Sequence, residues 1–178
     1  AQTTDKNAIN PEQMKKLVTE LKRDYDYVII DCPAGIEQGY KNAIAGADRA
    51  IVVTTPEISA VRDADRIIGL LEQETTIAPP KLIINRIRQH LMTNGDALDI
   101  NEITTHLSID LLGIISDDES VITSSNKGEP VVMDPNNTAS LGYRNIARRI
   151  LGESVPLMSM NVPKKSFMSK FRSLFSSK

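Results

Sequence analysis

The candidate chemistry of this chain lies in short polar clusters that directly follow apolar runs. The first cluster is Asp-Cys-Pro-Ala-Gly at residues 31–35, and it follows the apolar run at residues 27–30. A carboxylate at the end of a buried strand can hold Mg²⁺, usually through water, and Gly35 would let the backbone approach a phosphate closely. An Asp that caps the following turn explains Asp31 equally well. The pattern therefore predicts a Walker-B strand without excluding that structural role.

Polar residues follow three further apolar runs. These are Thr-Thr-Pro-Glu at residues 54–57, the pair Asn85 and Arg86, and Ser-Asp-Asp at residues 116–118. An Asn amide can bind the edge of a nucleotide base, and an Arg guanidinium can stack on its face. Taken one at a time, each cluster is only a polar strand end, so the order of the clusters along the chain carries the information.

The segment after residues 54–57 has the pattern of a well-capped helix. Ser59 can cap its first turn, and Asp63 and Asp65 fall in its early turns, where the helix dipole favours acidic side chains. Taken locally, a solvated helix face is the better interpretation of these residues.

The elements that must position these clusters alternate between strands and helices. Apolar runs that are too apolar to have a solvent face predict buried parallel strands at residues 27–30, 51–53 and 82–84, and more weakly at 111–115. Helical spacing of apolar residues predicts helices at residues 10–24, 37–47, 59–74, 99–107 and 138–151. This alternation predicts an α/β fold with a parallel sheet. Ligands of such sheets bind at the carboxyl ends of the strands, where the polar clusters lie.

Composition argues against several classes of protein. The 178 residues carry a net charge of −2, which favours neither a nucleic-acid-binding protein nor a strongly acidic one. The single cysteine, Cys32, excludes an internal disulfide and fits a reducing compartment. Only two histidines are present, which argues against a zinc site. No run of about 18 apolar residues occurs, so we expect no membrane-spanning helix, and no N-terminal signal sequence is visible.

Basic charge is concentrated at the C-terminal end of the chain. Residues 154–178 contain five basic and no acidic side chains, whereas the rest contains 16 basic and 23 acidic ones. Within residues 163–178, apolar side chains recur at the spacing of one helix face, and basic side chains flank that face. The apolar stripe is Phe167, Met168, Phe171, Leu174 and Phe175, and the flanking residues are Lys165, Lys170 and Arg172. All three phenylalanines of the chain belong to this stripe.

A basic helix with a bulky apolar face is typical of a segment that lies in the interface of an anionic membrane. Two alternatives are a helix docked on the chain's own core and a helix bound in a partner's groove. Core docking explains the apolar face but not the missing acids or the concentration of Phe, and nothing in the sequence supports a partner groove. We therefore predict a membrane-targeting helix, which binds weakly as one copy and strongly when two copies are linked.

The order of the clusters resembles the MinD family, which belongs to the deviant Walker-A ATPases together with the ParA-type partition ATPases. The matching strings are DCPAGIE at residues 31–37, TPEISAVRDADR at 55–66, NKGEP at 126–130 and YRNIARR at 143–149. The resemblance covers nearly the whole chain. It implies a P-loop NTPase-like, mostly parallel sheet with helices on both faces, whose N-terminal strands are missing here, and a C-terminal amphipathic helix.

The same resemblance implies roles for individual residues in the nucleotide site. Asp31 would be the Walker-B carboxylate, which binds Mg²⁺ through water, and Gly35 would belong to switch II. Asn85 and Arg86 would flank the adenine of ATP, and Asp117 would lie in the loop that closes over it.

Partner surfaces are also implied by the resemblance. Glu57, Ser59, Asp63 and Asp65 would form the surface that meets MinC, and MinE where one exists. A polar scaffold protein is the alternative partner to MinE. The family forms ATP-dependent homodimers, which are cytoplasmic and peripheral at the inner face of the cell membrane. There the dimer recruits MinC against FtsZ and so positions the division septum. No nucleic-acid partner is expected.

One part of the family's nucleotide site does not occur in this sequence. The family's Walker-A loop lies upstream of these residues, and no G-x-x-x-x-G-K-[ST] motif is present. We expect residues 1–153 to form a partial ATPase domain, 154–162 a linker and 163–178 the membrane-targeting helix. By itself the chain should hydrolyse no ATP at a useful rate, because the phosphate cradle is absent. The family's P-loop strand is interior to the sheet, so its loss should open strand edges and lower stability.

Three other functions stay open. The chain could belong to another ATPase of the same family, such as a ParA-type or flagellar-number ATPase, or it could be a non-catalytic membrane-recruitment module. A phosphoacceptor receiver domain would also end successive strands in Asp and Thr, as Asp31 and Thr54 do. A receiver needs a Lys where this chain has Asn85 and Arg86, which argues against that class.

Overall fold

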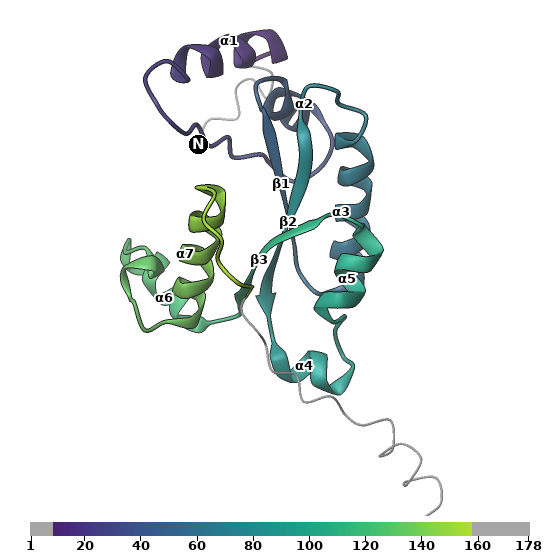
Figure 1. Ribbon diagram of the computed structural model, residues 1–178, viewed down its shortest axis with the longest axis vertical. Coiled ribbons are helices and arrows are strands. Elements are labelled where there is room, and N and C mark those ends of the chain that lie inside the picture. The colour runs from purple at the N-terminus through teal and green to yellow at the C-terminus, as the bar shows by residue number, and fades with distance from the viewer. Residues whose placement is uncertain (1–8, 158–178) are drawn as a thin grey trace, which may run out of the picture.

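A three-stranded parallel sheet organises the molecule (Figure 1). The computed structural model describes residues 9–157, and residues 1–8 and 158–178 lie outside the described part. The strands are β1 (Arg49–Thr54), β2 (Ala78–Ile87) and β3 (Asp110–Ser116), in the spatial order β1-β2-β3. Both neighbouring pairs are parallel, so the carboxyl ends of all three strands lie on one edge of the sheet. The α/β fold with a parallel sheet is therefore confirmed.

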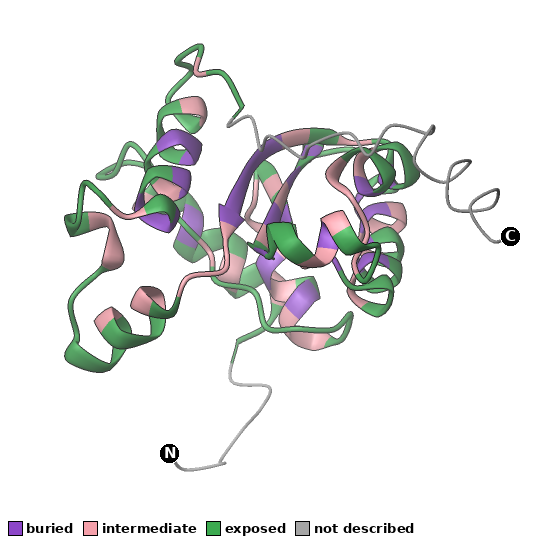
Figure 2. Cartoon of the chain, turned by 90° about the horizontal axis from the view of Figure 1, so that it is seen from below, coloured by how far each residue is buried: buried purple, intermediate pink, exposed green. Residues whose placement is uncertain are grey.

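Helices cover one face of this sheet and form the main core with it. These helices are α3 (Ile58–Leu71) and α5 (Ile100–Leu107), which Figure 1 shows on the same side of the strands. Leu82 and Ile84 of β2 and Ile103 of α5 are completely buried in this cluster. Each of these helices has buried and exposed residues (Figure 2), and Val61, Ala64 and Ile68 of α3 are among those buried in the core, as expected of an amphipathic helix on a sheet.

A second, smaller core lies on the opposite face, where α7 (Thr138–Ile150) packs on β3. Ala139 and Ile146 of α7 are buried against Leu112 and Ile115. The helix and strand approach closely because glycine occupies the contact: a Cβ at Gly142 would lie 2.8 Å from the carbonyl oxygen of Ile114. Helices thus lie on both faces of the sheet, as the family resemblance implies.

The close approach at Gly142 gives a stability prediction. We expect Gly142→Ala to lower the free energy of unfolding by about 1–2 kcal/mol, because overpacking against backbone outweighs the better helix propensity of Ala. Gly69 of α3 is the matched control, since a Cβ there meets nothing within 4 Å. Gly69→Ala should raise stability by about 0.5–1 kcal/mol. Urea unfolding followed by circular dichroism measures both changes, and a Gly142→Ala variant as stable as Gly69→Ala would contradict the packing described here.

The part of β1 that faces away from the main core is open to solvent. Val52 and Thr54 are buried, but Ile51 is 44% exposed and Val53 is 58% exposed. In residues 9–157, no strand pairs with β1 on the side opposite β2. An open strand edge with an exposed apolar face therefore borders the sheet at this point.

The predicted buried strand at residues 27–30 is wrong for the structure of this chain. These residues form no regular element, and Tyr27 and Ile29 are 58% and 93% exposed. An apolar strand is buried only when neighbouring strands and helices cover it. The resemblance places the P-loop strand, which this sequence lacks, in the interior of the sheet, and no described strand lies beside residues 27–30 to take its place.

The remaining predicted strands and the predicted helices are present, with shifted ends, but the predicted burial of residues 51–53 is wrong for Ile51 and Val53, which are exposed. The helices at residues 10–24 and 37–47 are α1 (Pro11–Leu21) and α2 (Gln38–Ala45). A capping box starts α1: Asn10 Oδ1 accepts a hydrogen bond from the Gln13 N–H at 2.8 Å, and Gln13 Oε1 accepts one from the Asn10 N–H at 3.0 Å. Three short helices were not predicted, namely α4 (Gln89–Asn94), α6 (Glu119–Lys127) and the 3₁₀ helix η1 (Val131–Met133).

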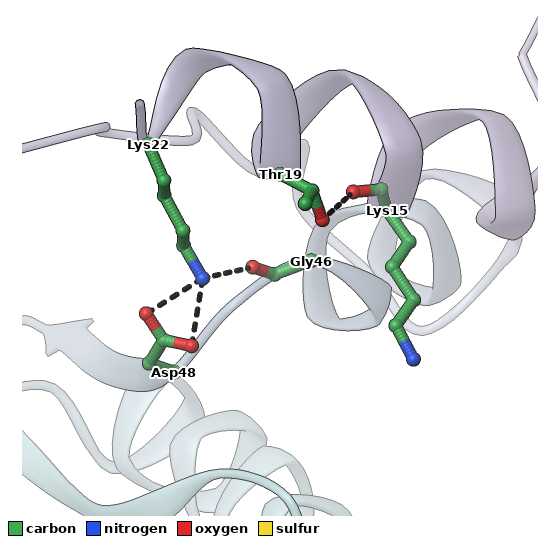
Figure 3. Close-up of polar contacts among 5 residues, drawn as sticks. All are labelled: Lys15, Thr19, Lys22, Gly46 and Asp48. Atoms are coloured by element: carbon green, nitrogen blue, oxygen red, sulfur yellow. Dashed lines mark hydrogen bonds and ion pairs between the residues drawn. The ribbon is translucent and has the colours of Figure 1, made fainter. Parts of the chain in front are cut away.

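An ion pair fastens the end of α1 to the segment that leads into β1. Figure 3 shows Lys22 Nζ between Asp48, at 2.7 Å from its carboxylate, and the carbonyl oxygen of Gly46 at 3.4 Å. Val18 packs beside this contact, since a Cβ at Gly46 would lie 2.9 Å from its Cγ2 atom. Helix α1 is thereby held against α2, next to the start of the sheet.

Candidate functional site

The carboxyl ends of β2 and β3 are joined by direct contacts. The backbone N–H of Asp117 donates to the carbonyl oxygen of Ile87 at 3.0 Å. Arg86 Nε lies 3.6 Å from Asp117 Oδ1 in an ion pair. Two of the clusters that the sequence singled out, Asn85 with Arg86 and the residues after Ile115, are therefore adjacent in space.

A bulge shapes the end of β2 where these residues lie. Ile84 pairs with Ile114 and Ile87 pairs with Ser116, so β2 holds one residue more than β3 between the same two pairs. Within the bulge, Arg86 adopts the left-handed backbone conformation with φ of 56°. Asn85 Oδ1 accepts a hydrogen bond from the Arg86 N–H at 2.9 Å. Bulges re-aim side chains beside functional sites, and this one leaves the Arg86 side chain 59% exposed at the sheet edge.

Asp117 also binds a second arginine. Arg88 Nε donates a short hydrogen bond to Asp117 Oδ2. This hydrogen bond, together with the charges of Arg88 and Arg86, holds the pKa of Asp117 below its usual value. Because the pKa of Asp117 is lowered in the folded state, its pairing with the arginines stabilises the fold at neutral pH. This stabilisation is lost as the pH falls through the lowered pKa.

The neighbouring Asp118 has a structural role. It is the N-cap of α6, and its Oδ1 accepts a hydrogen bond from the Ser120 N–H at 2.8 Å. Asn137, the N-cap of α7, donates to Asp118 Oδ2 at 2.8 Å. Hydrogen bonds from Ser120, with a smaller contribution from Asn137, lower the pKa of Asp118. The loop after β3 is thus fixed to the starts of two helices.

The loop at residues 31–35 packs on the beginning of α2. A Cβ at Gly39 would lie 2.3 Å from Pro33 Cγ, so only glycine allows this contact. Gly35 has φ of 99°, a conformation that favours glycine. Asp31 is exposed, and within the described residues no hydrogen bond or ion pair joins it to Asp117 or Arg86. Gly35 thus adopts a glycine-favouring turn, and no polar contact among the described residues joins Asp31 to Arg86 or Asp117.

The described residues offer Mg²⁺ only a partial ligand set. No group of three or more His, Cys, Asp or Glu side chains in residues 9–157 is arranged to hold a metal ion. Asp31 supplies one exposed carboxylate, which suits an ion that is held mainly by phosphate oxygens and water. Within residues 9–157, this single carboxylate fits a magnesium ion that arrives with a nucleotide.

The end of β1 contributes backbone geometry rather than reactive groups. Thr54 is buried, and its hydroxyl donates to the carbonyl oxygen of Thr55 at 3.4 Å. The carbonyl oxygen of the buried Pro56 accepts a hydrogen bond from the Leu98 N–H at 3.2 Å. These contacts hold the turn from β1 into α3.

The predicted partner surface lies on the outer side of α3. Glu57, Ser59, Asp63 and Asp65 are all exposed, while the opposite side of the helix packs on the sheet. The predicted capping role of Ser59 is wrong: α3 begins at Ile58, its N-cap is Glu57, and no side chain caps it. Asp63 and Asp65 lie beyond the first turn, where the dipole of the helix has less effect.

Sequence reasoning missed two residues that organise this end of the sheet. Arg88 follows the strand by one residue, and nothing in its local pattern indicates a pairing with a residue 29 positions later. Asn137 could have been found, because Asn directly before a helical pattern is a favoured N-cap residue. Its Oδ1 accepts a hydrogen bond from the Ser140 N–H at 2.9 Å.

The predicted membrane residues, 163–178, lie outside the described residues. In residues 9–157 no helix has the length and apolar character needed to cross a membrane.

Known proteins match this chain over nearly its whole length. A family model described as an AAA domain matches residues 2–84. The septum site-determining protein MinD of Bacillus subtilis is 70% identical over 175 residues, which cover 98% of this chain and 65% of that protein. MinD of Helicobacter pylori is 40% identical over 99% of this chain and 67% of its own length. The chain belongs to the MinD family. It spans about two thirds of the length of these relatives.

Solved structures of the MinD family match the fold. MinD of Aquifex aeolicus superposes with a TM-score of 0.80 at 40% identity, over 85% of this chain and 64% of that one. A structure of the Aquifex aeolicus MinC:MinD complex matches with the same TM-score and identity over 63% of its chain. MinD of Pyrococcus horikoshii, solved with Mg-ADP, has a TM-score of 0.70 at 23% identity, a likeness that shows the fold alone. The predicted P-loop NTPase-like sheet of the MinD family is confirmed.

Proposed function

We propose that this chain is the Walker-B side and C-terminal part of a septum-positioning ATPase. In this account the complete protein binds ATP with Mg²⁺, dimerises, holds the membrane through residues 163–178 and recruits MinC against FtsZ. The observation that carries the proposal is the 70% identity to a septum site-determining MinD over 98% of this chain. The match spans 98% of this chain, so the polar clusters at the strand ends lie within the matched length.

The nucleotide site is proposed at the carboxyl edge of the sheet. Asn85 would bind the edge of the base and Arg86 would lie against its face, with the loop at Asp117 closing beside them. Asp31 would hold a water of the Mg²⁺ shell, and Gly35 would let the backbone respond to the terminal phosphate. Mg²⁺, when bound with ATP, supplies electrostatic stabilisation of the phosphates. The joined ends of β2 and β3 support this placement, because they put an exposed guanidinium and a half-buried amide side by side.

The membrane function is proposed for residues 163–178, and residues 154–162 would link this helix to the ATPase part, residues 1–153. One amphipathic helix binds a membrane weakly, and two helices held in one dimer bind far better. ATP-dependent dimerisation would therefore place the protein at the inner face of the cell membrane, and hydrolysis would release it to the cytoplasm. The hydrolysis rate would then set the time that the protein spends on the membrane.

Partner binding is proposed for the outer side of α3. Its exposed residues Glu57, Ser59, Asp63 and Asp65 would contact MinC, and in turn MinE or a polar scaffold protein. The structural match to MinD from a MinC:MinD complex supports MinC as a partner. A homodimer is the state in which this surface would act.

Nucleotide binding tests the proposed function directly. We define the completed chain as this sequence joined to the P-loop segment of the Bacillus subtilis relative, which this chain does not cover. The completed chain should bind a fluorescent ATP analogue in the presence of Mg²⁺ with a micromolar dissociation constant, about 8 kcal/mol of binding free energy. The 178-residue chain should show no saturable binding. Equal binding by both would contradict the assignment of the phosphate cradle to the missing segment, and no binding by the completed chain would contradict the proposed function.

A second candidate function is membrane recruitment without catalysis. The absence of a Walker-A motif from this sequence favours it for the chain taken alone. The two functions differ in ATP binding by the completed chain, so the same titration separates them.

A further inference from the structure

Arg86 is held in an unfavourable backbone conformation at the end of β2. The left-handed region costs a residue with a side chain about 1–2 kcal/mol, and such conformations persist only where surrounding contacts fix them. Two contacts fix this one: the Asn85 side chain accepts the Arg86 N–H at 2.9 Å, and the Arg86 guanidinium lies 3.6 Å from the Asp117 carboxylate. Asp117 is therefore the carboxylate that the Arg86 guanidinium faces.

Asp117 is itself held by Arg88. The Arg88 guanidinium donates its Nε–H to Asp117 Oδ2, while Arg86 approaches the other carboxylate oxygen. Charge-assisted hydrogen bonds are stronger than neutral ones, and the Asp117 side chain is 25% exposed, so this pair is less screened than a fully exposed one. Arg88 also is the N-cap residue of α4, where its backbone is fixed between a strand and a helix. The Asp117 carboxylate thus pairs with Arg88, whose backbone is fixed at the start of α4, and with Arg86, whose side chain is mostly exposed.

We propose that Arg88 is a positioning residue of the nucleotide site, which acts through Asp117 to set the Arg86 guanidinium against the base. Arg88 need not touch the nucleotide for this role, because its Nε is already used by Asp117. The inference rests on the proposed function and adds to it the group that orients the base-binding arginine. It predicts that Arg88 affects recognition of the base and not of the phosphates.

The test measures the binding of two ligands, one with a base and one without, to the completed chain. Arg88→Ala should weaken binding of the fluorescent ATP analogue about tenfold, and Arg88→Lys about threefold, because Lys keeps the charge but not the planar fork. Magnesium tripolyphosphate, which has no base, is used as a competitor, and its inhibition constant should be unchanged in both variants. Arg148→Ala is the matched control: Arg148 is an arginine of α7 whose exposure is similar to that of Arg88, and it forms an ion pair with Glu153. The Arg148→Ala variant should bind both ligands as the unsubstituted completed chain does.

The outcomes separate this inference from the proposed function. Unchanged ATP binding by Arg88→Ala would overturn the positioning role while leaving the proposed function intact. Equal weakening of ATP and tripolyphosphate would also overturn it, since a general loss of structure or a phosphate contact affects both ligands. Failure of the unsubstituted completed chain to bind ATP would overturn the proposed function, and the inference with it. Thermal unfolding of each variant, followed by circular dichroism, shows that binding is compared among folded proteins.

Discussion

Anionic liposomes are expected to sediment the 178-residue chain and to leave its Phe171→Glu variant in the supernatant. Phe171 is the middle of the apolar stripe at residues 167–175. Burial of one Phe side chain contributes about 1.5–3 kcal/mol, and a carboxylate in its place is repelled by anionic lipid. We therefore expect the partition coefficient to fall by at least about tenfold. Because the nucleotide cradle is absent, binding of the unsubstituted chain should not depend on ATP.

A matched control separates the apolar stripe from the change of charge. Ser169→Glu introduces the same charge two residues away, at a spacing that falls on the opposite side of a helix from the stripe. It should weaken binding far less than Phe171→Glu does. If the two variants bind equally, simple electrostatic attraction accounts for binding and the amphipathic helix is wrong. If the unsubstituted chain stays in the supernatant but a fusion that carries residues 163–178 twice sediments, one copy of the helix binds too weakly to be detected. The prediction of a membrane-targeting helix would then stand.

ATP hydrolysis by the completed chain is expected to fall by about 100-fold or more in Asp31→Asn, because the amide cannot hold the Mg²⁺ shell as a carboxylate does. The 178-residue chain should show no hydrolysis above background. Asp26→Asn is the control, since Asp26 is an exposed carboxylate just before the same apolar run. A coupled phosphate-release assay at saturating ATP measures all four proteins. A near-normal rate for Asp31→Asn would show that Asp31 is only the cap of a turn.

The sheet and its helices could be predicted because their patterns are local. The apolar runs of β2 and β3 and the helical spacing in α3 reflect burial within the described chain, whereas β1 buries only one of its faces. The segment at residues 27–30 shows the limit of such reasoning. Its apolar pattern suits a strand with neighbours on both sides, but Ile29 is 93% exposed because no described strand lies beside it. Composition indicates what a segment would bury and not whether a partner is present.

The candidate site could be predicted in part for a similar reason. The order of parallel strands puts their polar ends on one edge, so Arg86 and Asp117 were expected near each other and lie 3.6 Å apart. The bulge at Asn85 and Arg86 could not be predicted, because the register of two strands depends on tertiary packing. The bond from Arg88 to Asp117 depends on that bulge, and so it too appears only in the structure.

ATP is expected to control membrane binding by residues 163–178, because it holds two copies of the protein in a dimer. The most direct measurement is liposome co-sedimentation of the completed chain with Mg-ATP and with Mg-ADP. ATP should raise the bound fraction strongly, since two linked amphipathic helices gain about 10²–10⁴ in avidity over one, and Phe171→Glu should abolish the difference. Equal sedimentation with ATP and ADP would rule out this control, because membrane binding would then be independent of the nucleotide.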